Sequence, residues 1–346
     1  MPKVLVTGSA GFIGFHLTKR LLDEGYEVLA IDNINDYYDP SLKIARLNVL
    51  GVTIEGDVIK SENPNFTFRK LNLEDFENII AEFKSFQPDY VVHLAAQAGV
   101  RYSLTNPRVY LQSNVDGFLS ILEGCRAVQP TNFVFASSSS VYGLNKGYPF
   151  QENVHTDHPM SLYAAIKRAN EMMAHSYAHL YGIPSTGLRF FTAYGPWGRP
   201  DMALFLFAKN ILDGKPIQVF NNGNMLRDFT FIDDLVEGIY RVMLNVPAEN
   251  PDFDHLNPTP EESSAPYRIL NIGNNAPVNL MDFIKAIERA VGKEAIIDFQ
   301  PLQPGDVTKT YADASRLQNL TGYKPNTDIQ TGVNAFVEWY REYYGA

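Results

Sequence analysis

Short runs of aliphatic and β-branched residues alternate with amphipathic stretches through the first half of the chain. The apolar runs occupy residues 3–8, 27–32, 90–96, 132–139 and 185–191. Between most of them, apolar residues recur at the spacing of a helix, for example over residues 12–25, 77–86 and 114–128. Continuous apolar strands separated by helices are typical of a parallel sheet that is covered on both faces. The pattern predicts an α/β fold whose first domain, residues 1–188, is built on a doubly wound parallel sheet.

The second half of the chain is less regular. Helical spacing recurs over residues 203–214, 233–244 and 280–291, with strand-like runs at 216–220 and 267–273. We expect residues 189–346 to form a smaller mixed α/β region, with segments that can cross back to the first domain. Residues 246–267 are rich in proline and acidic side chains, which predicts a surface loop or a partly disordered insertion.

The composition is that of an ordinary globular protein. The 346 residues are 45% hydrophobic and 20% charged, which is enough to build a full core, and the formal net charge is -10. This negative charge argues against nucleic acid and anionic membranes as partners, so any anionic ligand has to be held by local cations. The seven histidines are scattered and there is one cysteine, so no metal-ligand spacing is present and we expect no metal.

The sequence also bears on the location of the protein. Cys125 is the single cysteine and cannot form an internal disulfide, which favours a reducing compartment and a role as a core residue. The N-terminus leads directly into an apolar strand, without the pattern of a signal peptide. No apolar run approaches the roughly 18 residues of a membrane span. We expect a cytoplasmic protein that does not associate with membranes.

The first predicted strand ends in a glycine-rich turn. Residues 7–14 read TGSAGFIG, which places Gly8, Gly11 and Gly14 three residues apart, with Phe12 and Ile13 at the start of the next helix. Glycines allow the backbone to turn tightly and to approach a pyrophosphate. The charge of that group would be met by the free N–H groups and the positive end of the helix. The turn therefore predicts a dinucleotide-binding loop.

The second predicted strand ends in Asp32, which is followed by Asn33. An acid at this position can accept hydrogen bonds from the hydroxyls of the adenosine ribose. Because a carboxylate would repel a 2′-phosphate, the predicted cofactor is NAD rather than NADP.

Tyr163 and Lys167 lie four residues apart in a helical pattern, so their side chains share one face of the helix. Four serines lie at the end of the apolar run over residues 132–139 and just after it, in the sequence ASSSSVYG at residues 136–143. Together with the glycine spacing, these motifs resemble the short-chain dehydrogenase/reductase superfamily, whose extended branch has this length and two-part layout. The resemblance implies a Rossmann domain that binds NAD, and a catalytic triad of Ser138, Tyr163 and Lys167.

The chemistry of a base explains these residue types. A free tyrosine has a pKa of about 10, too high for a base at neutral pH, and a nearby ammonium and the positive nicotinamide ring would favour the phenolate. In this interpretation Tyr163 removes and returns a proton. Lys167 also holds the nicotinamide ribose, and Ser138 hydrogen-bonds the reacting oxygen.

The same resemblance implies further contacts with the cofactor. The segment HLAAQAG would wall the adenosine side of NAD through Leu94, Ala95 and Ala96. Lys43 and Arg46 are candidates for the pyrophosphate, with a solvated helix face as the alternative. Asn72 stands where the family usually has an aspartate near the adenine, and its amide can still hydrogen-bond the base. The expected cofactor contacts are Gly8, Gly11, Phe12, Ile13, Gly14, Asp32, Asn33, Lys43, Asn72, Leu73, Leu94, Ala95, Ala96, Tyr163 and Lys167.

Longer segments narrow the resemblance to the UDP-glucuronate 4-epimerases. They are residues 95–103, 188–207, 227–234 and 304–313, and the similarity spans nearly the whole chain. It implies a UDP-sugar substrate with a uronic acid, whose carboxylate an arginine fork would bind through two parallel hydrogen bonds. Thr192 and Arg199 would bind this carboxylate with help from the serines, while Arg227 would meet the diphosphate. The expected substrate contacts are Arg101, Ser138, Ser139, Ser140, Thr192, Arg199, Met202, Arg227 and Asp306.

The implied reaction is a reversible epimerisation at C4 of the sugar through a transient 4-keto intermediate. A dehydratase would show Asp-Glu directly after the triad serine, where this chain has Ser139 and Ser140. A decarboxylase usually carries an acid near the same serine. A UDP-glucuronate 5-epimerase or decarboxylase, a 4-epimerase for neutral sugars and a non-catalytic NAD-binding regulator stay open as alternatives. Relatives pair through two helices, here residues 114–128 and 161–182, so we expect a homodimer.

Overall fold

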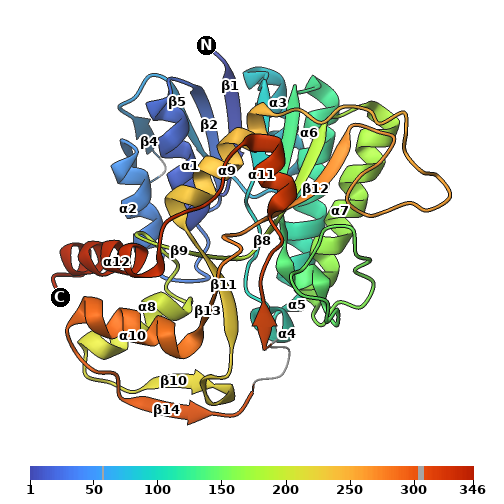
Figure 1. Ribbon diagram of the computed structural model, residues 1–346. Coiled ribbons are helices and arrows are strands. Elements are labelled where there is room, and N and C mark those ends of the chain that lie inside the picture. Colours follow the sequence, from blue (N-terminus) through green and yellow to red (C-terminus); the bar gives the residue numbers. More distant parts are fainter. Residues whose placement is uncertain (57, 303–307) are drawn as a thin grey trace.

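The computed structural model describes residues 1–56, 58–302 and 308–346. Its largest element is a seven-stranded sheet in the order β12-β8-β7-β6-β1-β2-β5, in which every neighbouring pair is parallel (Figure 1). The strand order reverses between β1 and β6, where a doubly wound sheet binds its ligands. The fold class predicted from the alternating pattern is confirmed. The strands are β1 (Lys3–Thr7), β2 (Glu27–Asp32), β5 (Phe66–Lys70), β6 (Tyr90–His93), β7 (Asn132–Ser138), β8 (Ser185–Phe190) and β12 (Tyr267–Ile272).

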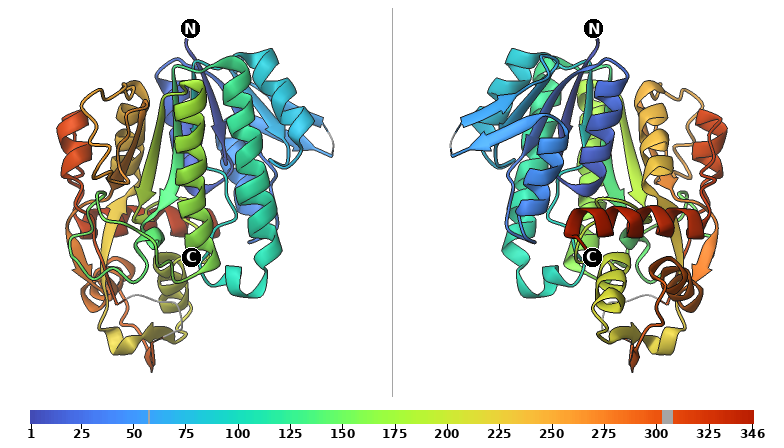
Figure 2. Two further views of the ribbon diagram at one scale, coloured as in Figure 1. Left: turned by 90° about the vertical axis from the view of Figure 1, so that its right-hand side faces the viewer. Right: turned by 90° about the vertical axis from the view of Figure 1, so that its left-hand side faces the viewer.

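Helices cover both faces of this sheet (Figure 2). One face carries α3 (Phe76–Phe86), α6 (Gly117–Val128) and α7 (Leu162–Tyr181), and the other carries α1 (Phe12–Asp23) and α9 (Ile232–Leu244). The residues of β1 show why: Leu5 faces the first group of helices, while Val4 and Val6 face the second. Side chains alternate between the faces of a strand, so a continuous apolar run supplies both cores.

Two segments from the second half of the chain return to the main sheet. β12 forms its edge by pairing with β8, and α9 packs against α1. α11 (Ser315–Thr321) packs in turn against α9. The division at residue 188 stays a prediction, but the sheet itself contains chain from both sides of it.

A smaller lobe lies beyond the carboxyl ends of the sheet strands (Figure 1). It has its own aromatic core, in which the rings of Phe229 and Phe283 stack with centroids 4.0 Å apart. Its strands form a small mixed sheet around β11 and a parallel pair of β10 and β14. The elements are β9 (Thr192–Tyr194), α8 (Ala203–Leu212), β10 (Ile217–Phe220), β11 (Leu226–Phe231), β13 (Pro277–Asn279), α10 (Leu280–Val291), β14 (Ile297–Gln300), β15 (Lys309–Thr310) and α12 (Ile329–Tyr344).

The remaining elements are short. The helix predicted over residues 114–128 has a longer and less regular start, because α5 (Pro107–Leu111) and a π-helical turn (Gln112–Asp116) precede α6. The others are α2 (Ser41–Val49), β3 (Val52–Glu55), β4 (Val58–Ser61), α4 (Tyr102–Thr105), and 3-10 turns at Ser139–Tyr142 and Asn221–Gly223.

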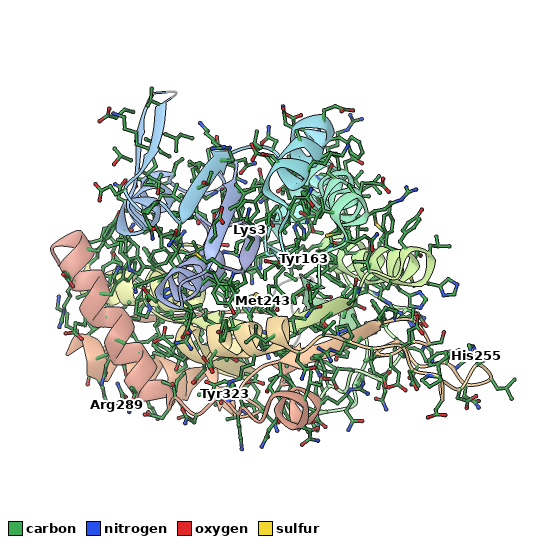
Figure 3. All side chains as sticks on the ribbon, turned by 90° about the horizontal axis from the view of Figure 1, so that it is seen from above. Lys3, Tyr163, Met243, His255, Arg289 and Tyr323 are labelled. Carbon is green, nitrogen blue, oxygen red and sulfur yellow. The ribbon has the colours of Figure 1, made fainter. Side chains whose placement is uncertain are left out.

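Residues 246–266 form a long loop whose tip, near His255, projects away from the body of the molecule (Figure 3). Glu261 anchors its base, 3.1 Å from Arg316. In the described ranges, no helix is both long and apolar enough to cross a membrane, and no cluster of three potential metal ligands occurs.

Candidate active site

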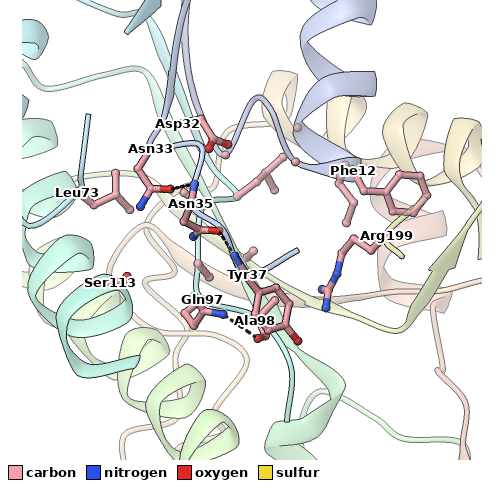
Figure 4. Close-up of a pocket in the computed structure, with 18 of the residues that line it drawn as sticks. Phe12, Asp32, Asn33, Asn35, Tyr37, Leu73, Gln97, Ala98, Ser113 and Arg199 are labelled. Carbon is pink, nitrogen blue, oxygen red and sulfur yellow. Dashed lines mark hydrogen bonds between the residues drawn. The ribbon is translucent and has the colours of Figure 1, made fainter. Parts of the chain in front are cut away.

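A deep cleft opens where the carboxyl ends of the sheet strands meet the smaller lobe. Its empty volume is about 1470 Å³, part of it open to solvent. Asp32 and Asn33 lie toward one end, and Arg199 lies beside Tyr37 toward the other (Figure 4). The cleft therefore joins the glycine-rich turn to the segment after β8.

The glycine-rich turn has no room for side chains. Gly8 has a φ of +76°, and a Cβ there would lie 2.7 Å from the backbone nitrogen of Ala95. A Cβ on Gly14 would lie 2.0 Å from the carbonyl oxygen of Gly8. α1 then begins at Phe12, after Gly11, and no side chain caps it. The N–H groups of its first turn are therefore available to an anion in the cleft.

The acid at the end of β2 has a structural role within the protein itself. Asp32 accepts hydrogen bonds from the backbone N–H groups of Ala10, at 3.1 Å, and Ile34, at 2.8 Å. These bonds fix the glycine-rich turn against β2. A carboxylate has about four lone-pair sites, so Asp32 retains acceptor capacity for ribose hydroxyls.

The adenosine side of the cleft is walled mainly by apolar residues. The predicted cofactor contacts that line the cleft here are Leu73, Leu94, Ala95 and Ala96, together with Ile13 at the start of α1. Asn72 does not line the cleft; its side-chain oxygen accepts a hydrogen bond from Asn33 at 3.1 Å. The amide of Asn72, expected near the adenine, therefore contacts the cleft only through Asn33. With a tight glycine turn, an uncapped helix start, an acid and an apolar wall, this part of the cleft fits NAD.

The two cations considered for the pyrophosphate lie in different surroundings. Lys43 lines the cleft, and its ammonium donates to the backbone oxygen of Asn35 at 2.9 Å and to its side-chain oxygen at 2.6 Å. Arg46 is fully buried and is no solvated helix residue. It donates to the carbonyl of Ala10 at 2.9 Å and to that of Trp197 at 2.6 Å. Arg46 therefore ties the glycine-rich turn to the chain just before Arg199.

Tyr163 and Lys167 both line the cleft, together with Ser138. Ser161 caps α7 by accepting a hydrogen bond from the N–H of Ala164 at 3.1 Å, which places Tyr163 in the first turn. The ring of Tyr163 also meets that of Tyr110 edge-on, with centroids 6.1 Å apart. The spacing seen in the sequence thus brings the phenol and the ammonium to the same wall.

Burial and the neighbouring groups act on the pKa of Tyr163 in opposite directions. Burial raises the pKa of Tyr163, and a hydrogen bond with Ser138 and the charge of Arg199 act in the opposite direction. The ammonium of Lys167 donates a hydrogen bond to the carbonyl of Ala136 at 2.8 Å. Burial also lowers the pKa of Lys167 to about 8. In the protein alone, Arg199 is therefore a cation that favours the phenolate.

The serine run divides at the end of β7. Ser138 is the last residue of the strand and lines the cleft, as does Ser137. Ser139 and Ser140 enter a 3-10 turn and are not part of the lining. The hydroxyl of Ser138 accepts a hydrogen bond from the N–H of Ser140 at 3.2 Å, and the two hydroxyls are also 3.2 Å apart.

Arg199 already binds a carboxylate in the structure. Its Nε and Nη2 donate to the two oxygens of Asp201 at 3.0 Å and 2.5 Å, and Tyr37 donates to the same acid at 3.1 Å. Burial alone would lower the pKa of Arg199, but Asp201 raises it, so the guanidinium stays charged. The side chain remains 24% exposed at the cleft.

The predicted substrate residues do not all meet in one place. Thr192 lines a smaller neighbouring cavity of about 360 Å³, which shares Phe12, Arg199 and Met202 with the main cleft. Arg101 lies outside both linings, with its guanidinium 4.9 Å from the ring centroid of Phe220 in the smaller lobe.

Two further substrate positions belong to the lobe beyond the cleft. Arg227 on β11 also lies outside both linings and donates to the carbonyl of Leu226 at 3.1 Å. Asp306 lies outside the described residues. Most of the cofactor and triad positions therefore line the main cleft, whereas Arg101 and Arg227 do not.

Several residues of the cleft had no signal in the sequence. Ser113 reaches it from the π-helical turn, and Tyr37 and Gln97 come from loops after β2 and β6. Ser137 could have been found as a neighbour of Ser138 in the serine run. Loop residues carry no periodicity that indicates which way they face, so the others could not.

The chain was compared with known proteins. Residues 4–257 match the NAD dependent epimerase/dehydratase family, and the chain belongs to this family. Protein CapI of Staphylococcus aureus is 52% identical over 342 residues, which cover 99% of each chain. A probable UDP-glucuronate 4-epimerase of Rhizobium meliloti is 46% identical, with 99% of this chain and 98% of the relative covered.

A solved structure extends the similarity to the whole fold. It is the crystal structure of UDP-glucuronic acid 4-epimerase from Bacillus cereus in complex with UDP-glucuronic acid and NAD. The TM-score is 0.83 at 31% sequence identity, and 99% of this chain and 100% of the other are covered. The chain is therefore similar along its full length to proteins of one enzymatic class.

Proposed function

We propose that this protein catalyses the reversible C4 epimerisation of UDP-glucuronate to UDP-galacturonate, with NAD held in the cleft. The observation that carries the proposal is that Ser138, Tyr163 and Lys167 share one cleft with the glycine-rich turn and with Arg199. The relative from Rhizobium meliloti and the structure from Bacillus cereus carry the names of enzymes with this activity. No observation favours the alternatives that were open on the sequence.

The division of labour follows the two regions predicted from the sequence. Residues 1–188 hold the dinucleotide, and residues 189–346 supply most of the contacts to the sugar nucleotide. Bound NAD would supply a hydride acceptor and donor for C4 of the sugar, so the reaction would involve no net oxidation.

The chain supplies the proton chemistry and the orientation of the sugar. Tyr163 removes the proton of the C4 hydroxyl and returns it after the 4-keto sugar has rotated in the site. Ser138 hydrogen-bonds the same oxygen, and the charge of Arg199 favours the phenolate of Tyr163. Tyr163 therefore keeps the proton while the 4-keto sugar rotates and exposes its other face.

The carboxylate of the sugar needs a fixed partner. A 4-keto uronic acid is a β-keto acid, which loses CO₂ when its carboxylate stands perpendicular to the carbonyl plane. Arg199 is suited to hold the carboxylate in the other orientation, because its planar fork can bind a carboxylate through two parallel bonds. Asp201 occupies that fork in the structure, so the sugar carboxylate would replace it there. Thr192 lies on the neighbouring cavity that Arg199 also lines.

The deciding experiment is to incubate the purified protein with UDP-glucuronate and to identify the product by NMR. We expect a mixture of UDP-glucuronate and UDP-galacturonate, approached from either side. A decarboxylated pentose product, inversion at C5, or turnover confined to neutral UDP-sugars would each contradict the proposal. A preparation that turns over none of these substrates would favour the non-catalytic regulator.

We further propose that the protein is a homodimer that pairs through α6 and α7. The two helices lie side by side on one face of the molecule (Figure 2). Large apolar side chains on and beside them are exposed, including Leu119 by 40%, Met172 by 54% and Leu180 by 66%. Exposed apolar groups on adjacent helices are typical of a four-helix interface. The cytoplasmic location expected from the sequence stays a prediction.

A further inference from the structure

Glu171 is a fully buried acid that the reaction above does not use. It follows Tyr163 and Lys167 at intervals of four residues on α7, so the three side chains share one face of the helix. A buried carboxylate is costly unless it is paired and hydrogen-bonded. Its partners therefore show what the position is for.

The three residues of α7 contact three consecutive residues of β7. Lys167 donates to the carbonyl of Ala136 at 2.8 Å, and the hydroxyl of Ser137 donates to Glu171 at 2.6 Å. Ser138 forms the hydrogen bond that acts on Tyr163. Because Ser137 and Ser138 are neighbours and both line the cleft, the bond to Glu171 fixes the strand end that carries the triad serine.

Glu171 is also surrounded by cations. Both of its oxygens pair with Arg189 of β8, at 2.9 Å and 3.0 Å, and Arg168 approaches it to 2.8 Å. Burial would raise the pKa of Glu171, but these arginines and Ser137 lower it, so the acid is ionised at neutral pH. Its charge opposes the effect of burial on Lys167, whose pKa is lowered to about 8.

We propose that Glu171 is a positioning residue of the active site. It keeps Lys167 as an ammonium within the buried wall of the cleft, and it holds Ser137 and Ser138 in register with α7. The inference rests on the proposed function, in which a charged Lys167 is required. A purely structural ion pair with Arg189 would need neither the contact to Ser137 nor the neighbouring lysine.

The other groups around this cluster do not titrate near pH 8. Burial, together with the charge of Lys167, lowers the pKa of His93 on β6 to about 3. Burial raises the pKa of Tyr142 to about 12 and that of Tyr267 well above its usual value. Burial also raises the pKa of Glu152, which lies on the far side of Arg189. In the protein without bound sugar nucleotide and NAD, burial also raises the pKa of Tyr163, so a change around pH 8 in that state reports on Lys167.

The test is the pH dependence of kcat in Glu171→Gln. Without the acid the pKa of Lys167 falls, so its charge is lost at lower pH. We expect the decline of kcat at high pH to begin about one pH unit lower than in the wild type. The loss of kcat should be about tenfold at pH 9 and less than about threefold at pH 6.5. Glu171→Asp should restore most of the limb.

A second variant distinguishes the effect on Lys167 from the effect of misfolding. Glu171→Gln leaves Arg189 buried without a carboxylate, whereas the double variant E171Q/R189Q removes both charges. The double variant should show the same shifted limb. Glu82→Gln is the matched control, because Glu82 on α3 pairs with Arg69 at 2.8 Å and is not part of the cleft lining.

A readout without substrate separates this inference from the proposed function. In protein labelled with ¹³C at the lysine side chains, the Lys167 signal is assigned by its loss in Lys167→Met and titrated in each variant. A wild-type titration in E171Q and the double variant, with only a lower Tm, would overturn the role of Glu171. If the wild type had no epimerase activity, the titration would still decide this point.

Discussion

At the scale of single residues, the phenol of Tyr163 experiences opposing influences. Burial favours its neutral form, while Ser138 and Arg199 favour the phenolate. The sequence placed Tyr163 beside Lys167 correctly, because the spacing of a helix fixes which side chains share a face. It could not show that Lys167 would turn to the carbonyl of Ala136, since no periodic pattern reports a side-chain direction.

Replacing Tyr163 by phenylalanine tests its role as the base. We expect Tyr163→Phe to lower kcat by about 10²–10⁴-fold, because proton removal loses its acceptor. The free energy of unfolding should change by less than about 1.5 kcal/mol, since one hydroxyl is lost from a partly buried ring. Turnover by NMR and urea unfolding measure the two effects. A variant with wild-type turnover would disprove the assignment.

Arg199 provides a second prediction, on specificity. Arg199→Met should raise KM for UDP-glucuronate by about 10- to 100-fold, because a charge-assisted bidentate contact is lost. Binding of UDP-glucose, which has no carboxylate, should change much less. Arg199→Lys should lie between wild type and Arg199→Met, because an ammonium lacks the planar fork. Calorimetric titration with both sugar nucleotides is the measurement, and equal losses for both would contradict the contact.

At the scale of elements, the strand-to-helix alternation of the first half was readable because buried parallel strands are apolar on both faces. The irregular start before α6 was not, since Pro107 and the π-helical turn interrupt the helical period there. The position of β12 at the edge of the sheet could not be predicted from the sequence either. Its apolar run is that of any buried strand, and nothing in the run specifies β8 as its neighbour.

The junction of β1 and α1 gives a prediction at this scale. Gly14→Ala would place a Cβ 2.0 Å from the carbonyl of Gly8, so either the helix or the turn must move. We expect a loss of more than about 2 kcal/mol in the free energy of unfolding, with weaker NAD binding. Urea unfolding and fluorescence titration with NAD test both. Gly147→Ala is the control, because nothing lies within 4 Å of its Cβ position, and a similar loss there would contradict the explanation.

At the scale of the whole molecule, the net charge of -10 and the cationic groups around the cleft are compatible because the cations are local. Lys43, Lys167 and Arg199 all line it. Composition therefore indicated what the protein does not bind in bulk, while the structure shows where an anion is met.

The proposed dimer is tested at the same scale. Met172→Asp introduces a charge on α7, where 54% of the side chain is exposed in the single chain, and should convert the dimer to a monomer in sedimentation experiments. Leu244→Asp is the matched control, because Leu244 is 43% exposed at the end of α9, which packs on the opposite face of the sheet from α6 and α7. A wild-type protein that sediments as a monomer at micromolar concentration would refute the interface.

The pairing of β12 with β8 has a consequence for how the protein is made. While the ribosome synthesises the chain, the nucleotide-binding half emerges early, but the open hydrogen-bonding edge of β8 finds its partner only once residues 267–272 have left the exit tunnel. Until then the nascent chain presents an aggregation-prone strand. A fragment that stops at residue 190, where β8 ends, should accordingly require a chaperone or form inclusion bodies.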